Sequence, residues 1–224
     1  MHKDVRALPV RLLYQDDALV VVDKPSGMLV HRSPGARDPI VVMFWVRDLL
    51  GVHTWAVHRL DRQTSGAVVV AIDEEAARRL SRMFVKGRIE KTYLAAVAGE
   101  LREAGCIDAP LEKAEGRLQD ARTEYVPLMV AGGRTWVRVH PVQGRRHQIR
   151  RHFAMIGHPL LGDEAYGDAA ENERARVEGG LDRLALHAAR IAFVHPLTRH
   201  AMAVEAPLPD DLAEPLRRLQ LHLV

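Results

Sequence analysis

Short apolar runs separated by turn-forming residues dominate the first part of the chain. The runs at 12–14 and 18–23 flank Gln15-Asp16-Asp17, a composition typical of tight turns, and so predict two short strands. A continuous, β-branched run covers residues 67–72 and predicts a strand buried on both faces. Lys24-Pro25-Ser26-Gly27 breaks the pattern between these runs and predicts a turn.

Helical spacing first appears between residues 40 and 50. Asp38 and Pro39 form a start signal, Gly51 forms a stop signal, and the apolar positions between them fall on one helical face. A second helix is predicted from Asp73-Glu74-Glu75 to about Val85, because acids favour the positive end of the helix dipole. The core-facing positions expected for these two helices are Val42, Trp45, Val46, Leu49, Leu80 and Phe84.

The second half of the chain mixes strands with helices. A Gly132-Gly133 turn predicts a hairpin, and a third helix is expected from a turn at Gly144 to Gly157, with Ile149, Phe153 and Ile156 as its apolar stripe. Weak patterning at 99–122 predicts a surface excursion. The other predicted elements are strands at 88–97, 124–130, 135–142, 184–195 and 201–206, a polar helix-prone stretch at 168–180, and a final helix from Pro209.

This irregular alternation, with hairpins, predicts the α+β class with a mixed, mainly antiparallel central sheet and flanking helices. A chain of 224 residues suits one large domain or two small ones. No apolar run approaches the length that spans a bilayer. The single Cys106 rules out an internal disulfide and fits a reducing, cytoplasmic location.

The most chemically suggestive stretch is His58-Arg59-Leu60-Asp61-Arg62-Gln63-Thr64-Ser65-Gly66, which lies between two apolar runs. It predicts a loop held on a rigid scaffold, where catalytic groups are often placed. Asp61 stands between Arg59 and Arg62, and nearby positive charge favours the carboxylate form. An ionised Asp can serve as a nucleophile or a base, whereas the alternative is a structural ion pair that closes a turn.

Positive charge is concentrated around this loop and one later stretch. Residues 59–91 carry eight Lys or Arg against five Asp or Glu, and residues 134–152 carry six Arg and no acid. The net charge of the chain is only +3, so the two stretches account for +9 and the remainder for −6. Such clustering favours an anionic partner, usually nucleic acid, over a solvated basic face. Arg78, Arg79 and Arg82 face either RNA phosphates or water.

Several motifs resemble those of the RluA family of pseudouridine synthases. HRLDRQTSG at 58–66 is similar to the family's HRLDxxTSG signature, and DKPSGMLVH at 23–31 to its NKPxGxxV motif. Lys91-Thr92-Tyr93 is similar to its KxY element. The stretch 144–167 resembles the GRxHQIRxH…GxPxxGDxxYG block, and 186–196 resembles LHAxxLxFxHP. Asp23 stands where the family commonly has Asn.

The resemblance implies a catalytic set and an RNA-binding set. Asp61 is expected to be the catalytic residue, Tyr93 to stack on the target base, and Arg150 to pair with Asp61. Arg59 is expected either to occupy the space of the flipped uridine or to contact phosphate. The expected RNA-binding residues are His58, Arg59, Arg62, Arg145, Arg146 and Arg151.

The implied fold is the pseudouridine synthase fold with a central RNA-binding cleft, as a single catalytic domain over residues 1–224 without an N-terminal S4 domain. The forms LVHRS and GRRHQIRRH are most similar to the tRNA pseudouridine-65 synthase branch, with enzymes acting on 23S rRNA or anticodon-stem tRNA as the alternative. RNA is the expected partner, and we expect a monomer that needs no membrane, cofactor or metal.

Two other classes of function remain open at this stage. A catalytically silent RNA-binding module would have basic patches without Asp61, Tyr93 and Arg150. A metal hydrolase is suggested by the twelve His, but no HExxH or CxxC spacing occurs. His147 and His152 are five residues apart and would point about 140° apart on a helix. His58 and His147 are therefore expected to be hydrogen-bonding scaffold residues.

Overall fold

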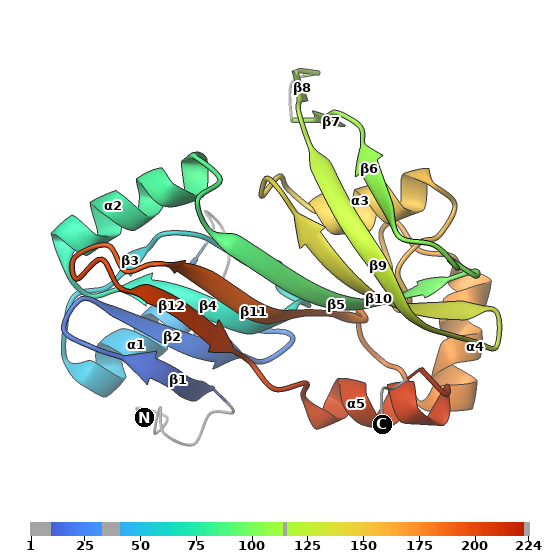
Figure 1. Cartoon of the computed structure of the whole chain (residues 1–224). Helices are drawn as coiled ribbons and strands as arrows, with labels where there is room; N and C mark the ends of the chain where they lie inside the picture. Colours follow the sequence, from blue (N-terminus) through green and yellow to red (C-terminus); the bar gives the residue numbers. More distant parts are fainter. Residues whose placement is uncertain (1–9, 33–40, 114–115, 222–224) are drawn as a thin grey trace. The chain divides into compact units, whose positions relative to one another are not determined.

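The computed structural model describes residues 10–32, 41–113 and 116–221. The chain falls into two compact units, Met1–Glu90 with Ala188–Pro207 and Lys91–His187 with Leu208–Val224. In chain order (Figure 1) the elements are β1 (Arg11–Gln15), β2 (Leu19–Lys24), α1 (Val42–Leu50), β3 (Trp55–Ala56), β4 (Ser65–Ala71), α2 (Glu74–Val85), β5 (Glu90–Ala98), β6 (Gly105–Asp108), β7 (Leu111–Glu112), β8 (Leu118–Gln119), β9 (Arg122–Ala131), β10 (Arg134–Pro141), α3 (Gln148–Met155), α4 (Ala169–Gly179), β11 (Leu186–Val194), β12 (Ala201–Glu205) and α5 (Asp210–Arg218).

The first unit is built on strands in the order β1-β2-β4-β11, with β12 paired to β11 and β3 to β4. β2 and β4 are antiparallel with Val21 opposite Val69, and both strands are wholly buried. This burial explains their continuous apolar sequence. Ala77 and Leu80 of α2 join Val21 and Val69 in one core cluster, so α2 covers one face of this sheet. Figure 1 shows α1 on the opposite side.

The predicted helices of the first unit are confirmed in the described residues. α2 begins where the Asp73 carboxylate accepts the Ala76 N–H at 2.7 Å, which satisfies a free donor of the first turn. α1 ends at Gly51, whose φ of 69° is the left-handed conformation that glycine favours. The start expected at Asp38 and Pro39 lies outside the described residues.

The second unit has strands in the order β5-β10-β9-β6. The predicted hairpin is confirmed as β9 and β10, joined by Gly132 and Gly133, which both have positive φ. The excursion expected at 99–122 is partly wrong, because β6 pairs with β9, β7 pairs with β8, and Ile107 and Leu111 are buried. These strands have two to four residues, too few to show a periodic pattern.

Helix α3 differs from its prediction at one position. Ile149 and Phe153 are buried as expected, but Ile156 is 37% exposed. The reason is that α3 ends at Met155, so Ile156 is the cap residue and no longer lies on the helical face. The helix-prone stretch at 168–180 forms α4, and Leu212 and Leu216 of α5 share a core cluster with Ala175 of α4.

Candidate active site

The loop that carries Asp61 is held by a buried lysine. Lys24 is completely buried, and its Nζ donates to the carbonyls of Pro25 at 2.9 Å, Met28 at 2.7 Å and Arg62 at 3.0 Å. An ammonium group has three protons, so three carbonyls match its donor capacity and offset the cost of removing the charge from water. The KPSG turn therefore shapes the backbone immediately after Asp61.

Further contacts fasten the same loop to the KPSG turn. The Ser26 hydroxyl donates to the Gln63 carbonyl at 2.8 Å, and the Gly27 N–H donates to the Arg62 carbonyl at 2.9 Å. The Arg62 Nε in turn donates a hydrogen bond to the Gly27 carbonyl at 2.9 Å. The Thr64 N–H donates to the carbonyl of Asp61 at 3.1 Å, which closes a tight turn at the candidate catalytic residue.

Gly66 ends the loop at a position that only glycine fits. Its φ is 111°, and a Cβ there would lie 2.2 Å from the carbonyl oxygen of Ala188 in β11. No side chain can be placed so close to backbone without moving it. The Ser-Gly end of the motif is thus explained by the close approach of two backbone segments within the first unit.

The other predicted residues of this loop differ in exposure. Arg59 and Arg62 are exposed, and Asp61 is half-buried. His58 accepts the Val69 N–H on its Nε2 at 2.9 Å, and its ring stacks on Phe84 with centroids 4.4 Å apart. These contacts fit a scaffold histidine that fixes the start of the loop against β4 and α2.

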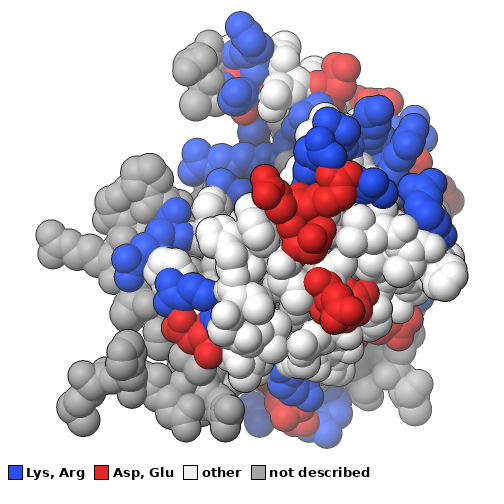
Figure 2. Space-filling model, turned by 90° about the vertical axis from the view of Figure 1, so that its left-hand side faces the viewer, with Lys and Arg blue, Asp and Glu red and all other residues white. Residues whose placement is uncertain are grey.

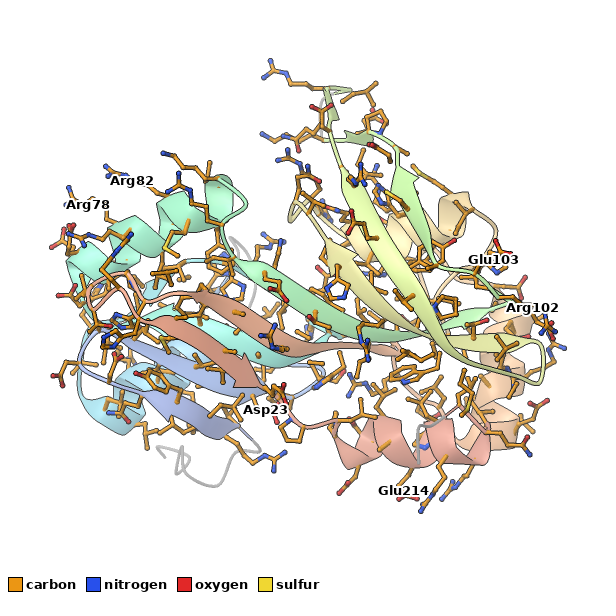
Figure 3. All side chains as sticks on the ribbon, viewed as in Figure 1. Asp23, Arg78, Arg82, Arg102, Glu103 and Glu214 are labelled. Carbon is orange, nitrogen blue, oxygen red and sulfur yellow. The ribbon has the colours of Figure 1, made fainter. Side chains whose placement is uncertain are left out.

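Helix α2 follows the Asp61 loop and β4 in the chain, and it carries the exposed arginines Arg78, Arg79 and Arg82. Arg78 and Arg79 both pair with Glu75 of the preceding turn, the Arg79 contact being 2.6 Å. Figure 2 shows Lys and Arg side chains along the upper part of the face it draws, with groups of Asp and Glu side chains below them, and Figure 3 shows Arg78 and Arg82 projecting away from the helix. Both interpretations, phosphate contact and a solvated face, fit this geometry.

Tyr93 lies in β5 of the second unit, opposite Val139 of β10. It is half-buried and packs against the core cluster that includes Ile149 and Phe153. Lys91 is on the same side of the strand, and its Nζ donates to the Gln143 carbonyl at 2.9 Å. Burial lowers the pKa of Lys91 to about 8. The lysine ties the start of β5 to the turn before α3.

Arg150 lies on α3 in a dense set of contacts. Its Nε donates to Oδ2 of Asp163 at 2.6 Å and its Nη2 to Oδ1 at 2.7 Å. The guanidinium also lies 5.0 Å from the centroid of the Tyr166 ring, whose hydroxyl is 3.0 Å from Nδ1 of His147. Burial raises the pKa of Asp163, but hydrogen bonds from Arg150 and the Tyr166 N–H outweigh it, and the pKa falls below its ordinary value. Asp163 is therefore ionised at neutral pH.

The three arginines expected to bind RNA beside Arg150 have different surroundings. Arg145 donates to the Asp120 carbonyl at 3.0 Å and Arg151 to the Glu112 carbonyl at 2.9 Å, so both brace the segment that carries β7 and β8. Arg146 is exposed. Each arginine still adds positive charge at this end of the second unit, as RNA binding requires.

The histidines of α3 are engaged in the fold. His152 is buried, its Nε2 lies 3.0 Å from the Ala109 carbonyl, and its Nδ1 lies 2.9 Å from the Thr123 hydroxyl. Burial lowers the pKa of His152, which favours the neutral ring. Among the described residues no group of His, Cys, Asp and Glu has an arrangement that could hold a metal ion, and no helix is long and apolar enough to cross a membrane.

Comparison with known proteins identifies the family. The sequence model of the RNA pseudouridylate synthase family matches residues 18–155. The chain belongs to this family. It is 38% identical to tRNA pseudouridine synthase C of Salmonella typhimurium, covering 92% of this chain and 88% of that protein. It is 37% identical to the Vibrio cholerae protein of the same name, covering 90% of this chain and 92% of that protein.

Solved structures agree with this assignment. Human RNA pseudouridylate synthase domain containing 4 has a TM-score of 0.78 and 25% identity, covering 95% of this chain and 94% of that chain. Human RNA pseudouridylate synthase domain containing 1 has a TM-score of 0.74 and 26% identity, covering 95% and 89%. The predicted pseudouridine synthase fold is confirmed, and the chain is an RNA-modifying isomerase.

Within this pseudouridine synthase, sequence reasoning missed two residues that the structure makes prominent. Lys24 was treated as part of a turn, yet it is the donor that holds the Asp61 loop. Asp163 was only one letter of a motif, yet it is the bidentate partner of Arg150. A buried charge leaves no periodic signal. An acid directly after a turn glycine, thirteen residues beyond Arg150, was the available hint.

Proposed function

We propose that this synthase converts uridine 65, in the acceptor-stem region of tRNA, to pseudouridine. The relatives named tRNA pseudouridine synthase C are 36–38% identical to it over about nine-tenths of its length, which supports tRNA as the substrate. The observation that carries the proposal is the Asp61 loop, which matches the family signature in sequence and is fastened by Lys24 and Ser26.

The reaction requires that the N-glycosidic bond of uridine break, the base turn, and a carbon–carbon bond form to the same ribose. Product and substrate contain the same atoms, so the net change needs no electron donor or energy source. Asp61 is the proposed catalytic residue, either by covalent attack on the nucleoside or by removal of a ribose proton. The tight turn holds the backbone from which the Asp61 carboxylate projects.

We assign Tyr93 and Arg150 to the same reaction. Tyr93 stacks on the target base. An aromatic ring can support the face of a flipped base without hydrogen bonding to the edge of that base. Arg150 pairs with Asp61 and keeps its charge balanced, and Arg59 fills the space that the uridine leaves. Flipping costs a few kcal/mol and less where the base is poorly stacked, so RNA structure contributes to selectivity.

Binding of the RNA backbone is assigned to the arginines around these groups. Arg62, Arg145, Arg146 and Arg151 supply positive charge from the loop and from the start of α3, and phosphate contacts of this kind provide affinity without reading sequence. His58 supports the loop through its contacts with Val69 of β4 and Phe84 of α2. We propose that the whole chain acts as one catalytic domain, as a monomer in the cytoplasm.

The test uses unmodified tRNA and rRNA from a strain that lacks this protein. Each RNA is incubated with the wild-type protein or with Asp61→Asn, and pseudouridine is mapped by chemical labelling and primer extension. We expect one tRNA uridine, at position 65, to convert with the wild type only. Conversion in rRNA alone would show that the substrate is wrong, and equal conversion by Asp61→Asn would show that Asp61 is not catalytic.

A control separates loss of chemistry from loss of folding. Asp73→Asn changes another aspartate of the same unit, one that caps α2 and lies outside the predicted site. Asn is nearly as good an N-cap as Asp, so this variant is expected to keep wild-type activity. The same assays repeated with EDTA are expected to give the same rates.

A further inference from the structure

Arg150 is held by more contacts than a structural ion pair requires. The Asp163 carboxylate receives its Nε and Nη2 in a parallel, two-bond arrangement, with distances of 2.6 and 2.7 Å. The two bonds fix the plane of the guanidinium and its rotation about the side-chain axis. The Asp163 side chain is fully buried and that of Arg150 is 11% exposed, so water does not compete for the pair.

Asp163 is itself held in place by the turn around it. Its Oδ1 also accepts the N–H groups of Ala165 and Tyr166, both at 3.0 Å. The preceding Gly162 has a φ of 70°, and a Cβ there would lie 2.0 Å from the Arg183 carbonyl oxygen. The side-chain amide of Asn172 in α4 accepts the Gly162 N–H and donates to the Asp163 carbonyl. The carboxylate therefore has little freedom to follow a moving partner.

Tyr166 restrains the guanidinium from a third side. Its ring lies 5.0 Å from the Arg150 guanidinium carbon, a cation–π distance, and its hydroxyl meets Nδ1 of His147 at 3.0 Å. His147 adopts a φ of 52° at the residue before α3. A non-glycine residue in this left-handed conformation is uncommon, and such strain persists only where surrounding contacts hold it.

We propose that Asp163 is a positioning residue that aims Arg150 for the pseudouridylation reaction, with Tyr166 and His147 completing the support. The inference rests on the proposed function, in which Arg150 pairs with the catalytic Asp61. A preorganised charge needs rigid partners of its own, because a group that must reorient during the reaction loses much of its effect. Asp163 meets this need through its contacts with the Gly162–Gly167 turn.

The first test compares Asp163→Asn with a matched control in the same unit. Glu171 is also a buried carboxylate, and its arginine partners, Arg134 at 2.5 Å and Arg174, lie outside the predicted site. Asp163→Asn is expected to lower kcat on tRNA about 100-fold with KM changed less than about 3-fold, since displaced catalytic geometry acts on the chemical step. Glu171→Gln is expected to lower thermal stability while leaving kcat unchanged.

A double-mutant cycle tests whether Asp163 acts through Arg150. In an Arg150→Gln background the guanidinium is gone, so adding Asp163→Asn is expected to change single-turnover conversion less than about 3-fold. An undiminished 100-fold effect in that background would overturn the proposal, as would a wild-type kcat for Asp163→Asn alone. Absence of conversion by the wild-type protein would instead overturn the proposed function.

Tyr166 gives a second route if Asp163→Asn does not fold. Tyr166→Phe keeps the ring and loses the bond to His147, whereas Tyr166→Leu loses both. We expect kcat to fall modestly, about 3-fold, for the first and about 10-fold or more for the second, with KM unchanged in both. Wild-type kcat for folded Tyr166→Leu would contradict the support assigned to this cluster.

Discussion

At the scale of single residues, two lysines show how burial changes the role of a cation. Lys24 has no exposure and holds the Asp61 loop through three carbonyl bonds, so its charge stabilises one backbone path. Lys91 is withdrawn from water less completely and donates to the Gln143 carbonyl, and burial lowers its pKa to about 8. The same residue type thus fixes a backbone path in the first unit. In the second unit it makes a single carbonyl contact and has a lowered pKa.

The lowered pKa of Lys91 predicts a pH-dependent stability. An unfolded lysine keeps its proton up to a pH near 10.5, whereas folded Lys91 loses it near pH 8. Between these values the unfolded state binds more protons, so the free energy of unfolding rises with pH. Relative to Lys91→Met, the wild type should gain between about 1 and 3 kcal/mol from pH 7.5 to pH 10 in urea unfolding. An unchanged difference at the two pH values would contradict this prediction.

At the scale of elements, the candidate catalytic loop depends on the strand that follows it. β4 is buried along its whole length, and its pairing with β2 places Lys24 opposite Gly66. Lys24, which holds the loop, is therefore the last residue of β2, whereas the loop itself leads into the neighbouring strand β4. A short loop tied at both ends in this way needs few residues of its own to hold the backbone at Asp61 in one path.

Gly66→Ala should break this arrangement. The added Cβ would meet the Ala188 carbonyl at 2.2 Å, and the positive φ disfavours any side chain. We expect a loss of about 3 kcal/mol or more in the free energy of unfolding, measured by urea titration. Gly144→Ala is the control, because its Cβ would meet no atom within 4 Å and its φ is ordinary, so it should change stability by less than about 0.5 kcal/mol.

At the scale of the whole molecule, the distribution of charge matters more than its sum. The formal net charge is +3, yet the stretch 134–152 alone carries +6. The exposed arginines of this stretch are Arg138 in β10 and Arg146 in the turn before α3, and the acidic residues are concentrated elsewhere in the chain. A phosphate backbone is therefore attracted to particular surfaces of a protein that is almost neutral overall.

Salt dependence can test the role of one such arginine. The affinity for tRNA should fall linearly on a log–log plot against salt concentration, and Arg146→Ala should reduce the slope by about one while leaving kcat unchanged. Arg102→Ala is the matched control, since Arg102 (Figure 3) is an exposed arginine of the same unit. It pairs with Glu100. Equal slopes for wild type and Arg146→Ala, from filter binding at several salt concentrations, would remove Arg146 from the RNA-binding set.

The sequence by itself determined most of the elements and the family. Strand and helix patterns depend on local periodicity, and the predictions for β2, β4, α2 and the β9–β10 hairpin are confirmed because each carries several periods or a specific turn. The short strands β6 to β8 were missed because so few residues show no period. The motif around Asp61 needed no structure to be identified, since its letters are contiguous in the chain.

Only the tertiary structure decided how the charged side chains are partnered. Lys24 and Arg62 are 38 residues apart, and Arg150 and Asp163 are 13 apart, so neither contact follows from local spacing. Burial of a charge is favourable only when the fold brings carbonyls or an opposite charge to the same point. For this reason the residues that hold the candidate catalytic groups emerged from the structure, whereas the candidate groups themselves were evident in the sequence.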